Sequence, residues 1–355
     1  MKKIFSLCLL LLCTSAFAQI QITSSFAPVP GNSFLSHEAD TTNINPGNSG
    51  ANQVWNFSSL VELGDSSYAG FVSPASTPNS SSYPGATVAS GISDPAVGSI
   101  YTYFQATGSS LSVLGTVATS TQTLNIPFSD PLIVQVYPFN YGNTNSDSYS
   151  GSGSYGMGSI KRRGTITNTY DAYGTLILPS GTVNNTARIK TVQTVTDSTF
   201  IGVNYISSIS TTTTTYQWVK QNYKFPLMEI SITTTTNYPS GTTSAYKYVS
   251  FVKNGTTIGI TNNNATVVEG YKLHYNYPNP FNPETQIRFS IPKNEFVSLR
   301  IYNSLGKEAA ELISQNLSAG DYTYFFDASG LSSGTYFYTL ASDNFTETKR
   351  MVLVK

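Results

Sequence analysis

The middle of the chain carries three acidic side chains that could act as acids or bases, Asp171, Asp197 and Glu229. Two carboxyl groups held roughly 5–10 Å apart can hydrolyse a glycosidic bond, one acting as the acid and the other as base or nucleophile. Asp171 lies between Tyr170 and Tyr173, whose rings suit stacking on a sugar. Aspartate is also common in type I turns, so a turn is the competing interpretation of Asp171.

The sequence offers few residues for other kinds of catalysis. His37 and His274 are the two histidines, and His37 stands beside Glu38 and near Asp40. His37 could be a base or a ligand, but a position in a surface loop is the simpler interpretation. A nucleophilic triad needs a histidine that an acid orients, and zinc sites need several His or Cys ligands. We therefore expect no metal site and no cofactor, and the sequence favours a protein that is not an enzyme.

Residues 151–156, Gly-Ser-Gly-Ser-Tyr-Gly, have the form G-x-G-x-x-G. A dinucleotide site needs this loop between a parallel strand and the start of a helix. The flanks are rich in Ser and Tyr and no helical pattern follows, so we interpret the segment as a loop.

Strands are the elements that would position all these residues. The threonine runs Thr211–Thr215 and Thr233–Thr236 disfavour helix, because β-branched side chains are stiff and pack well on a pleated surface. Short runs of this kind, divided by Gly, Pro, Asn and Ser, are typical of all-β proteins. We predict an all-β fold in which residues 19–258 form a large antiparallel β-sandwich-like region. The Gly- and Ser-rich stretch at 141–160 could join two subdomains, and residues 259–270 resemble a linker.

Charge is unevenly spread along this region. Residues 19–160 contain no Lys or Arg and seven acidic residues, whereas residues 161–253 contain nine basic and three acidic residues. Two subdomains, or solvated faces of differing charge, would both explain the pattern. The one tight basic cluster is Lys161-Arg162-Arg163, and phosphate tracking needs several spread contacts, so we expect no nucleic-acid partner. The densest aromatic group could form a platform for an unknown glycan or protein ligand, or simply pack in the core; it comprises Tyr205, Tyr216, Trp218, Tyr223 and Phe225.

The N-terminus has the pattern of a signal peptide over residues 1–18. Lys2 and Lys3 precede the apolar run Ile4–Leu12, and Ala16-Phe17-Ala18 gives an A-x-A site with cleavage between Ala18 and Gln19. This pattern predicts Sec export and signal peptidase as partners. Both cysteines lie in this segment, so the mature chain would have no disulfide.

The last eighty residues alternate most clearly. Ile287, Phe289 and Ile291 alternate with polar residues, as do Val297, Leu299 and Ile301 in the next run. Their spacing suits a small antiparallel immunoglobulin-like sandwich over residues 271–355. The proline-rich run Tyr277–Pro283 opens the segment and predicts extended backbone.

These C-terminal motifs resemble the type A C-terminal sorting domain carried by cargo of the type IX secretion system of Bacteroidetes. The resemblance rests on Tyr277–Pro283, Ile301-Tyr302 with Leu305-Gly306, Ala319–Tyr322, Leu331–Phe337 and Lys349–Lys355. The matching positions that the resemblance implies for sorting are Pro278, Asn279, Pro280, Gly320, Tyr322, Gly334, Tyr336, Lys349, Val352 and Lys355. It further implies passage through the periplasm, recognition by the type IX translocon and a sorting peptidase, and either release or attachment to surface lipopolysaccharide.

Residues 19–258, which the resemblance makes the cargo region, also resemble a known sequence type. The segments Gly50–Ser58, Tyr173–Leu176, Pro179–Gly181, Tyr216–Trp218 and Lys224–Leu227 are similar to an uncharacterised β-rich module that recurs ahead of such sorting domains. No activity comes with that resemblance. We therefore expect an exported, secreted or outer-surface protein with a non-enzymatic cargo region for surface structure, adhesion or ligand binding. The alternative is a secreted polysaccharide-active hydrolase that uses a carboxylate pair.

Overall fold

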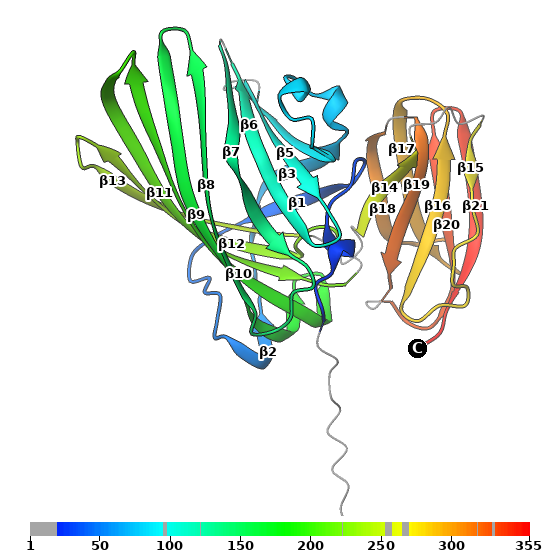
Figure 1. Cartoon of the computed structure of the whole chain (residues 1–355). Helices are drawn as coiled ribbons and strands as arrows, with labels where there is room; N and C mark the ends of the chain where they lie inside the picture. The colour runs from blue at the N-terminus through cyan, green and yellow to red at the C-terminus, as the bar shows by residue number, and fades with distance from the viewer. Residues whose placement is uncertain are drawn as a thin grey trace, which may run out of the picture.

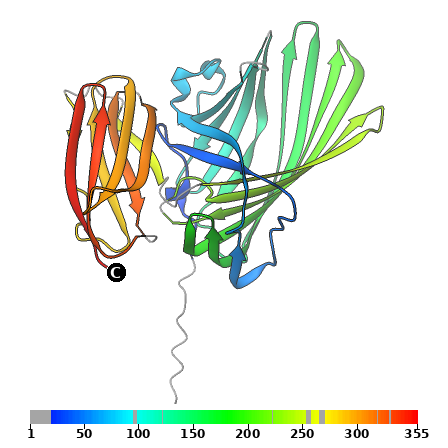
Figure 2. The same cartoon turned by 180° about the vertical axis from the view of Figure 1, so that it is seen from behind.

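The structure is a computed structural model that describes residues 20–94, 98–120, 122–221, 223–252, 258–264, 270–317, 319–328 and 331–355. The expected signal peptide and its cleavage site at Ala18 and Gln19 lie outside the described residues. Figure 1 shows a large curved sheet and a small sandwich as two bodies, and Figure 2 shows them from behind. The predicted all-β fold is confirmed. No helix within the described ranges is long and apolar enough to cross a membrane.

The large sheet has 13 strands, all antiparallel except for the pairing of β2 with β9. They are β1 (Ser33–Ala39), β2 (Gly50–Asn56), β3 (Glu62–Val72), β4 (Val88–Asp94), β5 (Gly98–Ala106), β6 (Ser110–Thr119), β7 (Thr123–Val136), β8 (Thr144–Tyr155), β9 (Gly158–Leu178), β10 (Gly181–Ile201), β11 (Asn204–Val219), β12 (Met228–Tyr238) and β13 (Thr243–Phe251). A short 3₁₀ helix, η1 (Ser24–Phe26), precedes β1, and two more, η2 (Pro74–Ser76) and η3 (Ser80–Ser82), lie between β3 and β4.

This sheet closes on itself. The order of paired strands runs from β10 through β11, β12, β13, β1, β3, β4, β5, β6, β7 and β8 to β9, and β9 pairs with β10. We call these strands the β-ring. Strand β2 lies outside the ring, in parallel on the C-terminal half of β9. The stretch at 141–160 forms β8 and its hairpin with β9, so the sheet is continuous through the position of the expected joint.

The threonine runs of β11 and β12 place a row of hydroxyl groups on the face of these strands that points into the ring. On β11 and β12, Thr211, Thr213 and Thr215 bond to Thr235, Thr233 and Ser231 through hydroxyl pairs 3.1–3.2 Å apart. Because side chains alternate across a strand, these pairs share one face. The same face continues into Gln217 and Glu229, which line a cavity inside the ring.

The opposite face of the same strands is covered by the segment that contains β2. Trp218 is fully buried there, with Trp55 and Phe57 edge-on to it at ring distances of 5.8 and 5.4 Å. Each such aromatic removes about 150–250 Å² from water. Trp218, Tyr223 and Phe225 of the expected aromatic group are therefore buried packing residues, whereas Tyr205 is half-exposed.

The C-terminal sandwich has two sheets of four strands, in the orders β14-β19-β16-β15 and β18-β17-β20-β21. Their bounds are β14 (Ile258–Asn264), β15 (Lys272–Leu273), β16 (Glu284–Ile291), β17 (Glu295–Asn303), β18 (Glu308–Leu317), β19 (Gly320–Asp327), β20 (Gly334–Ser342) and β21 (Phe345–Leu353). The alternating residues of β16 and β17 that the sequence singled out are all at most 1% exposed and face each other in one core. β14 pairs with β19, so the segment expected to be a linker contributes a strand to the sandwich.

Candidate functional site

The proline-rich segment at the start of the sandwich lies along its last strand. The side-chain Oδ1 of Asn279 accepts a hydrogen bond from the Val352 N–H at 3.0 Å, and its Nδ2 donates to the Arg350 carbonyl at 3.3 Å. The backbone of Phe281 then bonds to both Val352 and Val354. Pro278 and Pro280 have no backbone N–H, so the side chain of Asn279 makes the hydrogen bonds to the last strand at this point. Motifs 73 residues apart in the sequence therefore form one edge of the molecule.

A buried polar network holds that segment in place. Asn276, which is 3% exposed, donates through Nδ2 to the Pro278 carbonyl and to Thr285 Oγ1, both at 3.0 Å. Its N–H donates to the Tyr338 hydroxyl, which in turn donates to the His274 carbonyl. Buried polar groups are stabilising when they are paired in this way. Burial is also the main reason that the pKa of Tyr338 is raised to about 12.

The remaining sorting-motif positions divide between the core and the surface. Tyr322 and Tyr336 are buried; the Tyr322 ring stacks on Phe289 at 5.2 Å, and the Tyr336 hydroxyl donates to the Ser332 carbonyl. Gly320 and Gly334 are the first residues of β19 and β20. These four positions shape the domain, so they would be needed whether or not other proteins recognise it.

The terminal strand carries the motif residues that reach solvent. Lys349 Nζ lies 2.7 Å from Glu347 Oε1 and 4.4 Å from the centre of the exposed Tyr275 ring. The hydrogen bond from Lys349 is the main reason that the pKa of Glu347 is lowered. Val352 is half-buried, and the exposed Lys355 is anchored by its N–H, which donates to Ser333 Oγ at 3.0 Å. We call Tyr275, Lys349 and Lys355 the terminal-strand surface.

Asp171 is held in a buried ion pair. Both of its carboxylate oxygens accept hydrogen bonds from Arg188, at 2.9 and 2.8 Å. Arg188 is 1% exposed, and it also donates to the backbone carbonyls of Pro46 and Gly47. Its guanidinium lies 5.5–5.8 Å from the centres of the Trp55 and Trp218 rings. Asp171 is part of strand β9 rather than of a turn, and its carboxylate is fully occupied.

Asp197 has the same kind of partner on the inner face of the ring. Arg162 donates to both of its carboxylate oxygens, at 2.7 and 2.6 Å, and to Thr116 Oγ1 at 3.3 Å. Asp197 is nine residues from Arg188 along β10, which corresponds to about 30 Å of strand. Asp171 and Asp197 are therefore too far apart to act on one bond.

Glu229 is the candidate acid that lines a cavity. The cavity has a volume of about 390 Å³ and lies inside the β-ring, with lining residues from β3, β5, β6, β7, β9, β10, β11 and β12. Oε2 of Glu229 accepts a hydrogen bond from Gln217 Nε2, and Oε1 accepts one from Ser231 Oγ, both at 2.9 Å. Gln217 pairs with Ile189, eight residues from Asp197 on β10, so Glu229 and Asp197 are roughly 25 Å apart. The three acids do not converge.

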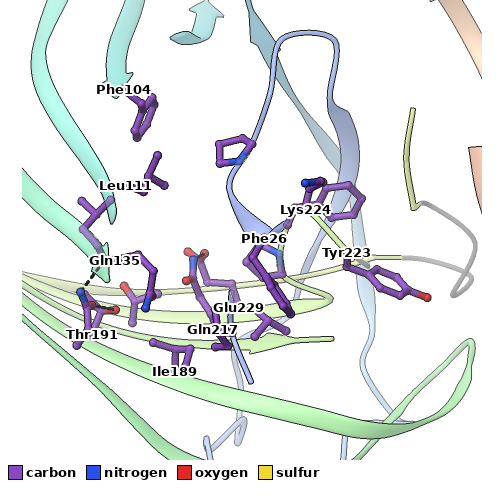
Figure 3. A pocket seen from close by; sticks show the side chains of 18 of the residues that line it. Phe26, Phe104, Leu111, Gln135, Ile189, Thr191, Gln217, Tyr223, Lys224 and Glu229 are labelled. Carbon is purple, nitrogen blue, oxygen red and sulfur yellow. Dashed lines mark hydrogen bonds between the residues drawn. The ribbon is translucent and has the colours of Figure 1, made fainter. Parts of the chain in front are cut away.

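The rest of the cavity wall is mixed in character. Figure 3 shows Gln217 and Glu229 side by side, with Ile189 and Thr191 on the same wall and Phe104 and Leu111 across from them. Thr191 Oγ1 donates to Asn168 Oδ1 at 2.6 Å, which fixes two polar groups of the wall. Lys224 donates to the carbonyls of Ser25 and Ala27, and burial lowers its pKa. These neighbours of Glu229 come from distant segments of the chain, so no local sequence pattern could bring them together.

Two other sequence candidates have structural roles. His37 lies in β1 rather than in a surface loop, and its Nδ1 is 2.6 Å from Glu62 Oε1. Among Gly151, Gly153 and Gly156, the first two lie in β8, where an added Cβ would come 2.7 Å from the Pro127 oxygen and 2.2 Å from the Asn125 oxygen. Gly156 forms the following hairpin turn with a φ of +52°. Gly151 and Gly153 therefore let the neighbouring strand β7 approach β8 closely.

Comparison with known proteins identifies the C-terminal part. Residues 275–355 match the secretion system C-terminal sorting domain. No curated protein matches the chain. A solved structure of PorZ, described as an essential bacterial surface component of the type-IX secretion system of Porphyromonas gingivalis, aligns at 10% identity and a TM-score of 0.18. That alignment covers 71% of this chain and 51% of PorZ, and the similarity is too low to indicate a common fold. The predicted sorting domain is confirmed.

Proposed function

We propose that this protein, a type IX secretion cargo by its sorting domain, is a non-enzymatic binding protein that acts at the cell surface or after release. Its cargo region would take a small ligand into the cavity of the β-ring. In this proposal residues 1–18 direct Sec export and are removed by signal peptidase. The periplasmic chain is then recognised through the sandwich, and the sorting peptidase releases the cargo or links it to lipopolysaccharide.

The cavity is the observation that carries the binding proposal. Its volume of about 390 Å³ falls within the roughly 300–1,000 Å³ range of ligand pockets in proteins. Apolar side chains such as Phe104 and Leu111 face an amide, hydroxyl and carboxylate row made by Gln217, Thr215 and Glu229. This combination fits a ligand with an apolar body and hydrogen-bond donors at one end. No second carboxylate stands near Glu229 among the candidate acids, so the geometry favours binding over glycoside hydrolysis.

The fluorescent amine N-phenyl-1-naphthylamine tests this proposal, because it has an apolar aromatic body and one N–H donor. We expect residues 19–355 to bind it with a rise in emission. Leu111→Trp, which fills the cavity, should reduce the affinity at least tenfold. Thr212→Trp is the matched control, because Thr212 lies exposed on the outer face of β11. Equal binding by both variants would contradict a site in the cavity.

Sorting is tested in a host that has the type IX apparatus. Deleting residues 349–355 removes most of the strand that pairs with Asn279 and Phe281, so we expect the protein to accumulate in the periplasm. That deletion also damages the fold. Lys355→Ala changes only an exposed side chain and leaves the backbone bond to Ser333 intact. Normal export of both variants would contradict recognition through the terminal-strand surface.

A further inference from the structure

Two neighbouring hairpins of the β-ring end in exposed apolar residues. Met157, in the turn between β8 and β9, is 89% exposed, and Val203, in the turn between β10 and β11, is 93% exposed. Gly158 pairs with Ile201, so the two turns lie next to each other. Figure 1 shows the β8–β9 hairpin projecting from one end of the sheet.

The surroundings of the two turns extend the apolar surface. Ile201, Tyr205 and Ile206 are each about half-exposed. We call these three residues, with Met157 and Val203, the tip patch. Tyr205 packs edge-on to Phe200 at a ring distance of 5.9 Å, so an aromatic pair lies at the base of the patch. Single exposed apolar residues are ordinary, but a group of them gathered at two adjoining turns marks a contact surface.

Basic side chains lie directly below the tip patch. Lys161 is exposed on β9, and its Nζ lies 4.9 Å from the centre of the Phe200 ring. It is three residues from Gly158, so it is about 10 Å from the turn. Arg163 is exposed on the same outer face, near Asp130, whereas Arg162 points to the inner face and is paired with Asp197. Of the two exposed basic residues on this face of β9, Lys161 is therefore the closer to the tips.

We propose that the tip patch inserts into an anionic lipid surface. Amphipathic structures at a membrane bury their apolar groups about 5–10 Å into the boundary between headgroups and acyl chains. At that depth Lys161 would lie at the level of the lipid phosphates and complement their charge. A symmetric contact between two copies of the tip patch would instead bring the Lys161 side chains of both copies together. The charge therefore favours a lipid over a second copy of this chain.

The test uses residues 19–355, so that the apolar run of the proposed signal peptide is absent. Sedimentation with vesicles of phosphatidylcholine and phosphatidylglycerol (3:1) should show binding. The wild type should bind vesicles of pure phosphatidylcholine more weakly. Lys161→Gln should weaken binding to the mixed vesicles by about the same factor. Met157→Ser combined with Val203→Ser should reduce binding at least tenfold. Leu305→Ser is the matched control, because Leu305 is 90% exposed in a turn of the sandwich.

A depth measurement distinguishes insertion from adhesion. Both tryptophans of the chain, Trp55 and Trp218, are buried, so Val203→Trp adds one reporter on the surface. The emission of this variant should shift to the blue with vesicles and be quenched by brominated acyl chains. The proposal is overturned if the double serine variant binds as the wild type does, or if the emission of the Val203→Trp variant stays unchanged. It is also overturned if the wild type ignores vesicles but forms dimers that the double variant abolishes.

Discussion

Replacing Arg188 by Met should strongly destabilise the β-ring. The change leaves the carboxylate of Asp171, which is 12% exposed, without its partner, and removes two hydrogen bonds to backbone carbonyls. Breaking a buried ion pair from one side costs about 3–5 kcal/mol. For a region of this size, each kcal/mol corresponds to roughly 2–4 °C in the unfolding midpoint. We therefore expect the midpoint to fall by about 6–20 °C.

Tryptophan fluorescence during denaturation measures this change selectively. Trp55 and Trp218 are the only tryptophans, and both lie in the cargo region beside Arg188. Arg188→Met combined with Asp171→Leu should recover much of the loss, because an apolar pair leaves no buried charge. Arg162→Met is the comparison variant. The side chains of Arg162 and Asp197 are 23% and 27% exposed, so we expect a smaller loss.

Two outcomes would refute this reasoning. One is that the free energy of unfolding of Arg188→Met differs from that of the wild type by less than about 1 kcal/mol, because a broken buried ion pair should cost more than that. The other is a double variant no more stable than the single variant, which would mean that the two side chains are not coupled. Either result would reopen a functional role for Asp171.

Three further predictions concern the close approach of β7 to β8 and the sandwich. Gly153→Ala should destabilise the β-ring, because its Cβ would meet the Asn125 oxygen, whereas Gly108→Ala, with open space around it, should be neutral by thermal melting. Asn279→Ala removes two hydrogen bonds, each worth about 0.5–1.5 kcal/mol, so the amides of residues 350–354 should exchange faster by mass spectrometry while those of β17 do not change. The neutral Tyr338 hydroxyl contributes stability that is complete below its unfolded pKa of 10.0 and is lost as pH rises towards the folded value of about 12. Tyr338→Phe should flatten that part of the alkaline denaturation curve, and an unchanged slope would contradict the assignment.

The sandwich could be predicted closely because its signals are local. Each of its central strands alternates with period two, and residues such as Ile287 and Leu299 are fully buried as the pattern requires. The proline motif also predicted an extended segment. Its contact with the last strand was not visible in the sequence, because Asn279 and Val352 are far apart along the chain and meet only through the packing of two sheets.

The cargo region was predicted less completely. The threonine runs correctly indicated strands. The sequence did not show, however, how far apart the carboxylates of Asp171, Asp197 and Glu229 lie in the fold. Arg188 was not singled out, and Arg162 was noted only as part of the basic cluster at 161–163, although these two residues are the ion-pair partners of Asp171 and Asp197. Cross-strand pairing fixes both ion pairs, and a register shift of one residue would move every partner to the other face.

Local sequence was enough to specify the strands, the alternation of their faces and the sorting motif, since these depend on residues within a few positions of one another. Three features were set by the folded chain instead: β1 meets the distant β13 to close the ring, Glu229 faces a cavity, and Met157 and Val203 lie together. The physical reason is that a strand's own residues specify which side chains share a face, whereas its neighbours are chosen by the pairing and packing of the entire chain.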